Sequence, residues 1–88
     1  MKNVLVIGST GQIGSELTMK LRNMIPDGNI VAGYIPGAEP KGILLESGPA
    51  EEANVKNAQQ LADIVEKYKI DTIYNLAALL SAVAEAKP

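Results

Sequence analysis

The stretch that decides the fold of this 88-residue chain is Val4-Leu5-Val6-Ile7-Gly8-Ser9-Thr10-Gly11-Gln12-Ile13-Gly14. Its first four residues are aliphatic and mostly β-branched, which predicts a short strand buried on both faces. Glycines then recur at positions 8, 11 and 14, with the spacing Gly-x-x-Gly-x-x-Gly. Because glycine allows tight turns and close backbone contacts, this spacing predicts a sharp turn from the strand into a helix.

Beyond the turn, the first half of the chain is predicted to form a helix, a strand and a loop. Apolar residues at helical spacing predict the inward face of the first helix, and they are Ile13, Leu17, Leu21 and Met24. Pro-Asp-Gly at 26–28 should end this helix. Residues 29–35 then read as a second strand, 36–42 as a loop rich in Pro and Gly, and 43–45 as a short third strand.

The second half of the chain repeats this alternation after an irregular stretch that begins at Ser47. Asn57 is predicted to cap a second helix, with Gln60 three residues later in the capping-box position. The apolar face of that helix is predicted to consist of Leu61, Ile64, Val65 and Tyr68. Residues 72–77 read as the last strand. Buried strands alternating with amphipathic helices predict a doubly wound α/β fold with a parallel sheet and right-handed crossovers.

The composition narrows the chemistry that the chain can perform. It contains no Cys and no His, which excludes disulfides, thiol nucleophiles, Cys/His metal sites and a Ser-His-Asp triad. The net charge of −2 gives no reason to expect a nucleic-acid partner, since such a partner usually needs a basic face. No apolar run reaches the ~20 residues of a membrane span, and the start has no signal-peptide layout. We therefore expect a globular, cytoplasmic chain with no membrane partner and no metal site.

Each glycine of the turn has a predicted task in binding a dinucleotide. The spacing is a variant of the dinucleotide fingerprint, in which the pyrophosphate lies on N–H groups at the start of the helix. Gly8 would permit the tight turn, Gly11 would let the backbone approach the pyrophosphate, and Gly14 would let the helix pack close to the sheet. A strand-to-helix turn without a ligand is the alternative interpretation of the same glycines.

Two strand ends carry further candidate residues. The fingerprint normally has an Asp or Glu about 20 residues on, to hold the adenosine ribose, and here that position is Tyr34. A phenol can donate one hydrogen bond or stack on adenine, and no Arg stands beside it for a 2′-phosphate, which favours NAD over NADP. Alternatively, Tyr34 is a strand-end residue with its hydroxyl in water. The small residues of 75–78 would either admit a cofactor or fill a gap between helix and sheet.

Together these residues resemble the extended short-chain dehydrogenase/reductase superfamily, which includes nucleotide-sugar epimerases. A narrower resemblance is to the epimerase-like L-threonine 3-dehydrogenases. It is carried by residues 7–17, by Ser47-Gly48-Pro49, and by Leu76-Ala77-Ala78-Leu79-Leu80-Ser81-Ala82 with Glu85 and Lys87-Pro88. The resemblance covers essentially the whole chain. It implies an NAD(P)-binding, Rossmann-like parallel sheet with flanking helices, of which this chain would form the incomplete, N-terminal half.

The resemblance also implies which residues contact the cofactor, NAD. Members of the family usually have an acid where Tyr34 stands and an Asp near the adenine where Asn57 stands, and both positions are candidate cofactor contacts here. An Asn can still accept and donate hydrogen bonds there. The other implied contacts are Gly8, Gly11, Gln12, Ile13, Gly14, Ala77, Ala78 and Leu79, with Ser81 near the substrate.

The chain lacks the residues that carry the family's chemistry. Those enzymes use a Tyr-x-x-x-Lys pair, in which the tyrosine is the general acid and base and the lysine lowers its pKa. The residues four positions after the three tyrosines of this chain are Ala38, Thr72 and Ala78. We therefore expect no catalytic residue. We expect residues 1–88 to be the N-terminal part of a dinucleotide-binding domain, without the catalytic and substrate-binding parts.

Three functions fit this sequence. The first is the NAD-binding segment of an L-threonine 3-dehydrogenase-like oxidoreductase, whose parent enzyme transfers a hydride from threonine to NAD. The second is a segment of a nucleotide-sugar epimerase or dehydratase, which the selective residues 79–81 disfavour. The third is a free-standing, non-catalytic nucleotide-binding or interaction module. If the chain is really this short, the open edge of its last strand predicts self-association through residues 72–77.

Overall fold

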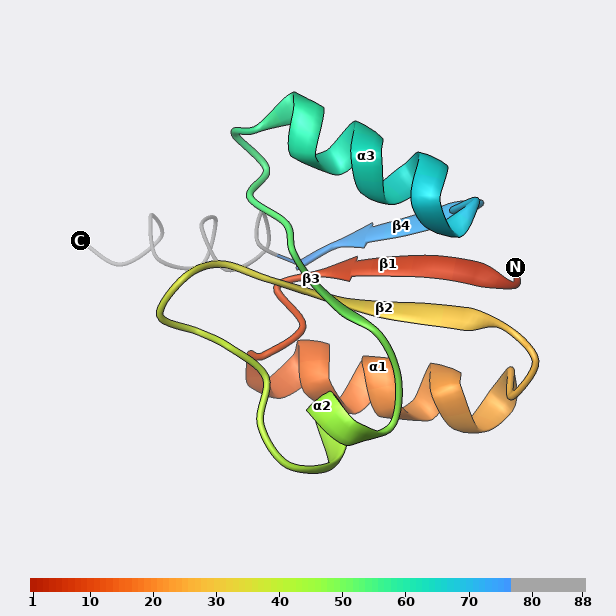
Figure 1. Cartoon of the computed structure of the whole chain (residues 1–88). Coiled ribbons are helices and arrows are strands. Elements are labelled where there is room, and N and C mark those ends of the chain that lie inside the picture. The colour runs from red at the N-terminus through yellow and green to blue at the C-terminus, as the bar shows by residue number, and fades with distance from the viewer. Residues whose placement is uncertain (77–88) are drawn as a thin grey trace.

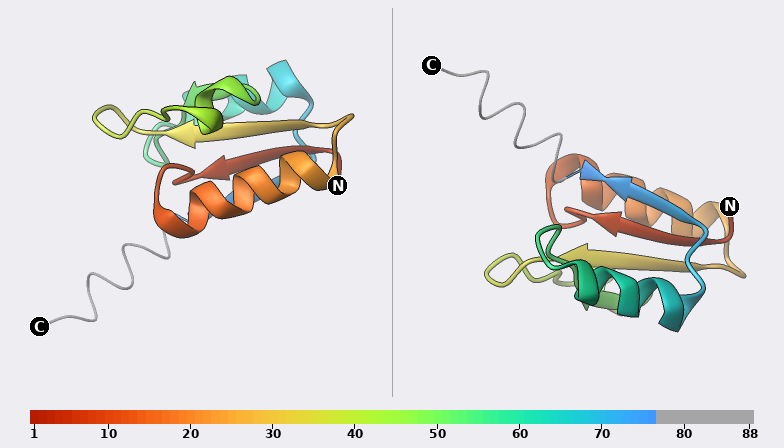
Figure 2. Two further views of the ribbon diagram at one scale, coloured as in Figure 1. Left: turned by 90° about the horizontal axis from the view of Figure 1, so that it is seen from below. Right: turned by 90° about the horizontal axis from the view of Figure 1, so that it is seen from above.

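Strands and helices alternate along the described part of the chain, residues 1–76 of the computed structural model (Figure 1). The elements are β1 (Asn3–Ile7), α1 (Gln12–Met24), β2 (Asn29–Tyr34), α2 (Ile43–Glu46), β3 (Ala50–Glu52), α3 (Ala58–Tyr68) and β4 (Thr72–Asn75). The four strands form one sheet in the order β3-β2-β1-β4, and every neighbouring pair is parallel. With α1 on one face of the sheet and α3 on the other (Figure 2), the arrangement is Rossmann-like, which confirms the predicted fold class.

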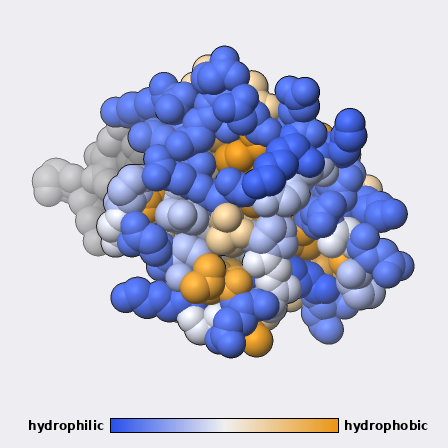
Figure 3. All heavy atoms as spheres, in the orientation of Figure 1, coloured by the Kyte–Doolittle hydropathy of each residue, from blue (hydrophilic) through white to orange (hydrophobic). Residues whose placement is uncertain are grey.

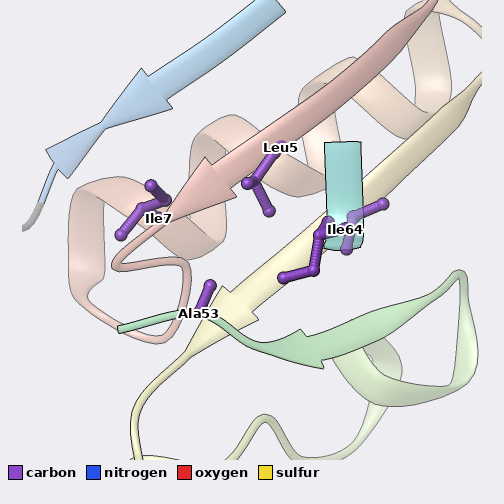
Figure 4. Close-up of a cluster of buried hydrophobic side chains, with 5 residues drawn as sticks. Leu5, Ile7, Ala53 and Ile64 are labelled. Carbon is purple, nitrogen blue, oxygen red and sulfur yellow. The ribbon is translucent and has the colours of Figure 1, made fainter. Parts of the chain in front are cut away.

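The core has two halves because alternate residues of a strand point to opposite faces of the sheet. On the α3 side, Leu5 and Ile7 of β1 pack with Ile64 of α3 and with Ala53 (Figure 4). On the α1 side, the other β1 residues pack with Leu21 of α1. Every β1 residue from position 4 to 7 is at most 3% exposed. This confirms the prediction that the aliphatic run before the glycine turn is buried on both faces.

The inward face of α1 differs from the predicted stripe. Leu21 is buried as expected, but the side chains of Ile13 and Met24 are 59% and 61% exposed. The buried helix residues are Gly14, Thr18 and Leu21. Small residues at the first two positions let α1 lie close to the sheet, and the Thr18 hydroxyl is satisfied because it donates to the Gly14 carbonyl at 2.7 Å.

The prediction of a third strand at 43–45 is wrong. These residues form the short helix α2, and the third strand is β3, which lies in the stretch expected to be irregular. The guanidinium of Arg22 explains this arrangement, because it donates to three main-chain carbonyls and one hydroxyl. Its acceptors are the carbonyls of Ile30, Leu44 and Pro49 and the hydroxyl of Ser47. A single side chain of α1 thus ties α2 and the start of β3 to β2.

The helix that was expected after Asn57 is α3, and it begins as predicted. The Asn57 side chain accepts a hydrogen bond from the Gln60 N–H at 3.1 Å, which confirms the N-cap. The Gln60 side chain does not complete a capping box with Asn57, because its carbonyl oxygen accepts from the Asn54 N–H at 2.7 Å instead. The helix ends at Tyr68, and its C-cap, Lys69, adopts the left-handed conformation with φ of 56°.

A carboxylate joins the amino ends of β1 and β4. One oxygen of Asp71 accepts from the N–H groups of Asn3 and Lys2, at 2.9 and 3.0 Å, and the other accepts from the Thr72 hydroxyl at 2.7 Å. These bonds, that of the Asn3 N–H foremost, lower the pKa of Asp71 to about 2. The charged form of this side chain therefore stabilises the junction of the two strands.

The surface of the described part is mostly polar, and apolar side chains show on the face of Figure 3 as separate patches. Ile43 and Leu45 of α2 are 66% and 51% exposed, which fits a helix held by Arg22 rather than by its own apolar face. Within residues 1–76, no helix has both the length and the apolar content needed to cross a bilayer.

Candidate functional site

The glycine turn is held against the end of β2 by one carbonyl group. The N–H groups of Gly8 and Ser9 donate to the Gly33 oxygen at 3.2 and 3.1 Å, and the Ser9 hydroxyl donates to the same oxygen at 2.8 Å. Gly8 has a φ of 83°, in the region that favours glycine. Ser9 is fully buried, so its hydroxyl serves the turn and faces no solvent.

Gly14 is required for the first turn of α1 to lie on this glycine turn. A Cβ at this position would lie 2.1 Å from the Gly8 oxygen and 2.9 Å from the Ser9 Cα, closer than side chains approach backbone. Gly11 is the N-cap of α1 and has no capping side chain. The first N–H groups of a helix have no partner within it, and together with the dipole they favour an anion.

A cavity of about 820 Å³ opens beside the turn at the carboxyl ends of β1 and β2, and its size is typical of ligand sites. Three segments build it: the glycine turn, the chain that follows β2, and the chain that follows β3. The lining residues are Ile7, Gly8, Thr10, Gly11, Tyr34, Ile35, Pro36, Ala38, Ala53, Asn54, Val55 and Lys56. Carboxyl ends of parallel strands are where α/β sheets bind ligands.

The structure brings some of the predicted site residues together. Gly8, Gly11 and Tyr34 all line the cavity, although they come from two different strands and their turns. Asn57 does not line it, because its side chain caps α3. Gln12, Ile13 and Gly14 form the first turn of α1 beside the cavity. Ala77, Ala78, Leu79 and Ser81 lie outside the described residues.

The third wall of the cavity, residues 53–56, is not among the residues predicted from the sequence. Asn54 and Lys56 come two and four residues after the end of β3, so they stand at the carboxyl edge of the sheet. The sequence signal was present, since residues after a parallel strand belong to that edge. It was missed because the third strand was predicted at 43–45 instead of at β3.

A second, smaller groove of about 260 Å³ lies between β3 and α3. Four of the residues that line it are charged, and they are Glu51, Glu52, Asp63 and Lys67. One oxygen of Glu51 accepts from the Tyr68 hydroxyl at 2.6 Å and from the Lys67 ammonium at 2.9 Å. The hydrogen bond from Tyr68, followed by that from Lys67, lowers the pKa of Glu51. Partial burial, followed by the bond to Glu51, raises the pKa of Tyr68. These groups hold β3 against α3, and none of them lines the larger cavity.

Comparisons with known proteins agree with this geometry. Residues 4–87 match the model of the NAD dependent epimerase/dehydratase family. An uncharacterised epimerase/dehydratase from Staphylococcus saprophyticus is 40% identical over all 88 residues. The chain spans about a quarter of the length of such relatives, 27% in this case.

Solved structures of L-threonine dehydrogenases are similar to the chain over its whole length. The enzyme from Clostridium difficile is 46% identical with a TM-score of 0.79, and the chain covers 27% of it. The holo form of the enzyme from Cupriavidus necator is 32% identical with a TM-score of 0.74, again with 27% of that chain covered. On the family match over residues 4–87, the chain belongs to the NAD dependent epimerase/dehydratase family.

Proposed function

We propose that this chain is the dinucleotide-binding segment of an L-threonine 3-dehydrogenase-like oxidoreductase. One observation carries the proposal: the cavity of about 820 Å³ is bounded by the glycine turn that opens α1. The similarity to two L-threonine dehydrogenases over the full chain favours this parent over a nucleotide-sugar epimerase or dehydratase. The whole enzyme's activity is a proposal, because the chain spans only 27% of those proteins.

The residues present fit the adenosine diphosphate half of a nicotinamide dinucleotide. The pyrophosphate would lie on the turn from Gly8 to Gly11 and on the N–H groups of Gln12, Ile13 and Gly14. The adenosine would occupy the cavity, between Tyr34 on one wall and the segment 53–56 on the other. The apolar side chains in these walls suit an adenine ring, and a predominantly apolar lining is usual for such sites.

In the parent enzyme, a bound NAD would accept a hydride from the secondary alcohol of threonine. This chain's own residues would bind and orient the cofactor, and the general acid and base would come from elsewhere, since the chain has no Tyr-x-x-x-Lys pair. We keep residues 77–79 as proposed cofactor contacts and Ser81 as the proposed residue near the substrate. Asn57 also stays a proposed contact, although its side-chain oxygen caps α3 and the residue does not line the cavity. A free-standing nucleotide-binding module in the cytoplasm is the second candidate, which the missing pair favours if the chain is really this short.

Isothermal titration of the purified chain with NAD tests binding, and a threonine-dependent NADH absorbance assay tests turnover. We expect binding without turnover, and turnover by this chain alone would refute the division of roles. Gly11→Val is the informative variant, because φ of −72° and ψ of 170° are open to any residue. It should fold, as circular dichroism would show, and lose binding. Ala62→Val on exposed α3 surface is the control, and equal binding by the two variants would contradict the proposal.

Self-association is a separate proposal that rests on β4 and applies if the chain is really this short. In residues 1–76 this strand pairs only with β1, and Ile73 is 48% exposed. An unpaired parallel edge with an apolar side chain favours addition of another strand. Sedimentation velocity over a range of concentrations should show dimers, and Ile73→Lys should shift them to monomers. A monomer at every concentration would refute this proposal.

A further inference from the structure

The larger cavity, as residues 1–76 form it, lacks the carboxylate that usually binds the ribose in sites of this type. None of its lining residues in the described part of the chain is a carboxylate, and one of them, Lys56, is a cation. Within residues 1–76 the ammonium of Lys56 makes no ion pair, and the ion pair in that part of the chain joins Lys67 and Glu51. The cavity is therefore electropositive on the wall that follows β3.

The acidic residues that are near in sequence are directed elsewhere. Glu51 and Glu52 line the groove between β3 and α3 instead of the larger cavity. Glu39 folds back on its own loop, where its carboxylate accepts from the Gly37 N–H at 3.0 Å. None of these three side chains lines the cavity, so none counters the charge of Lys56 inside it.

Hydrogen bonds tie the segment that leads to Lys56 to the end of β2 and hold its main chain. The Ala53 N–H donates to the Tyr34 carbonyl at 2.7 Å, which joins the two walls of the cavity. The Lys56 N–H donates to the Asn54 side chain at 2.9 Å, and the Asn54 N–H is in turn held by the Gln60 side chain at 2.7 Å. The lysine thus extends from a well-bonded turn three residues beyond the contact with Tyr34.

The end of the second strand is where this type of sheet binds the ribose next to adenine. A carboxylate there accepts hydrogen bonds from the ribose hydroxyls and repels a 2′-phosphate, but this chain has Tyr34 there. We propose that the cavity binds the 2′-phosphorylated dinucleotide, NADP, at least as tightly as NAD, with Lys56 as the residue that recognises the phosphate. The inference rests on the proposed function, since it names the cofactor form of the same site.

The test is isothermal titration of the full 88-residue chain with NADP and with NAD. We expect the Kd for NADP to equal or lie below that for NAD. Lys56→Gln should weaken NADP binding about fivefold more than NAD binding, which is the size of one exposed charge-assisted contact. Lys20→Gln, which removes an exposed charge on α1, should leave the ratio of the two constants unchanged.

A reciprocal variant and the dependence on salt sharpen the result. Tyr34→Asp should favour NAD by about tenfold over NADP, because it restores the acceptor and adds repulsion. Added salt should reduce any advantage of NADP in the unmodified chain. A Kd for NAD below that for NADP, or an equal effect of Lys56→Gln on both constants, would overturn the inference and leave the proposed function standing. Binding of neither dinucleotide by the folded chain would refute both.

Discussion

Replacing Gly14 by alanine sets two effects of opposite sign against each other. Alanine has the higher helix propensity, which alone would stabilise α1 by up to about 1 kcal/mol. The new Cβ would lie 2.1 Å from the Gly8 oxygen, where ordinary contact begins at 3.4 Å. The helix would therefore have to move by more than 1 Å from the glycine turn, and the nearest atoms are backbone, which cannot rotate away.

The displacement has a cost that exceeds the gain in propensity. Overpacking in a tight site typically costs about 1–3 kcal/mol, and the backbone neighbours place this case at about 3 kcal/mol. The net expectation is a loss of about 2 kcal/mol in the free energy of unfolding, together with weaker dinucleotide binding because the turn is distorted. The sign of the change is the decisive quantity, since propensity alone predicts a gain.

Urea unfolding followed by circular dichroism measures this free energy. Ser15→Ala is the matched control, because it changes the next residue of the same helix turn and should alter stability by at most about 0.5 kcal/mol. A Gly14→Ala chain as stable as the unmodified chain, or more stable, would show that the close contact of α1 with the turn does not exist.

Three further variants probe the contacts outside the cavity. Arg22→Met should destabilise the chain by roughly 3 kcal/mol, because it leaves several carbonyl acceptors without a donor, and urea unfolding would measure the loss. Asp71→Asn should lower stability at neutral pH. The native pKa of about 2 lies below the ordinary 3.8, so the unmodified chain should lose stability as pH falls from about 4 to 2. The variant should lose less over the same range in thermal melts at each pH, because only the contribution of Asp71 is removed and that of Glu51 remains. Lys69→Gly should stabilise the chain by up to about 1 kcal/mol in urea unfolding, because its φ of 56° suits glycine.

Local patterns were sufficient where neighbouring residues decide the structure. The run before Gly8, the glycine turn and the Asn57 cap each depend on residues within a few positions, and each was predicted. Residues 43–45 show the limit, because a short apolar run fits a strand or a helix equally well. Their helical turn is held in place by Arg22, which is distant in sequence and acts through hydrogen bonds that no periodicity reveals.

The part of the candidate site that depends on local sequence patterns could also be predicted. Gly8, Gly11 and Tyr34 line the cavity because the strand-turn-helix unit and the end of β2 were placed correctly. Asn54 and Lys56 were missed because their position follows from β3, whose location depends on Arg22. An error about one short strand therefore removed a whole wall of the site from the prediction.

The Gly33 carbonyl, which holds the glycine turn from a strand 24 residues away, links ligand binding to folding. The turn takes its shape only once β2 is docked beside β1, so an unfolded chain contains the glycines but offers no binding surface. A dinucleotide would then bind the native state alone, and by mass action it would stabilise that state by about 2.7 kcal/mol at a hundredfold excess over its Kd. The cofactor would therefore stabilise the folded chain as well as being the ligand of the site.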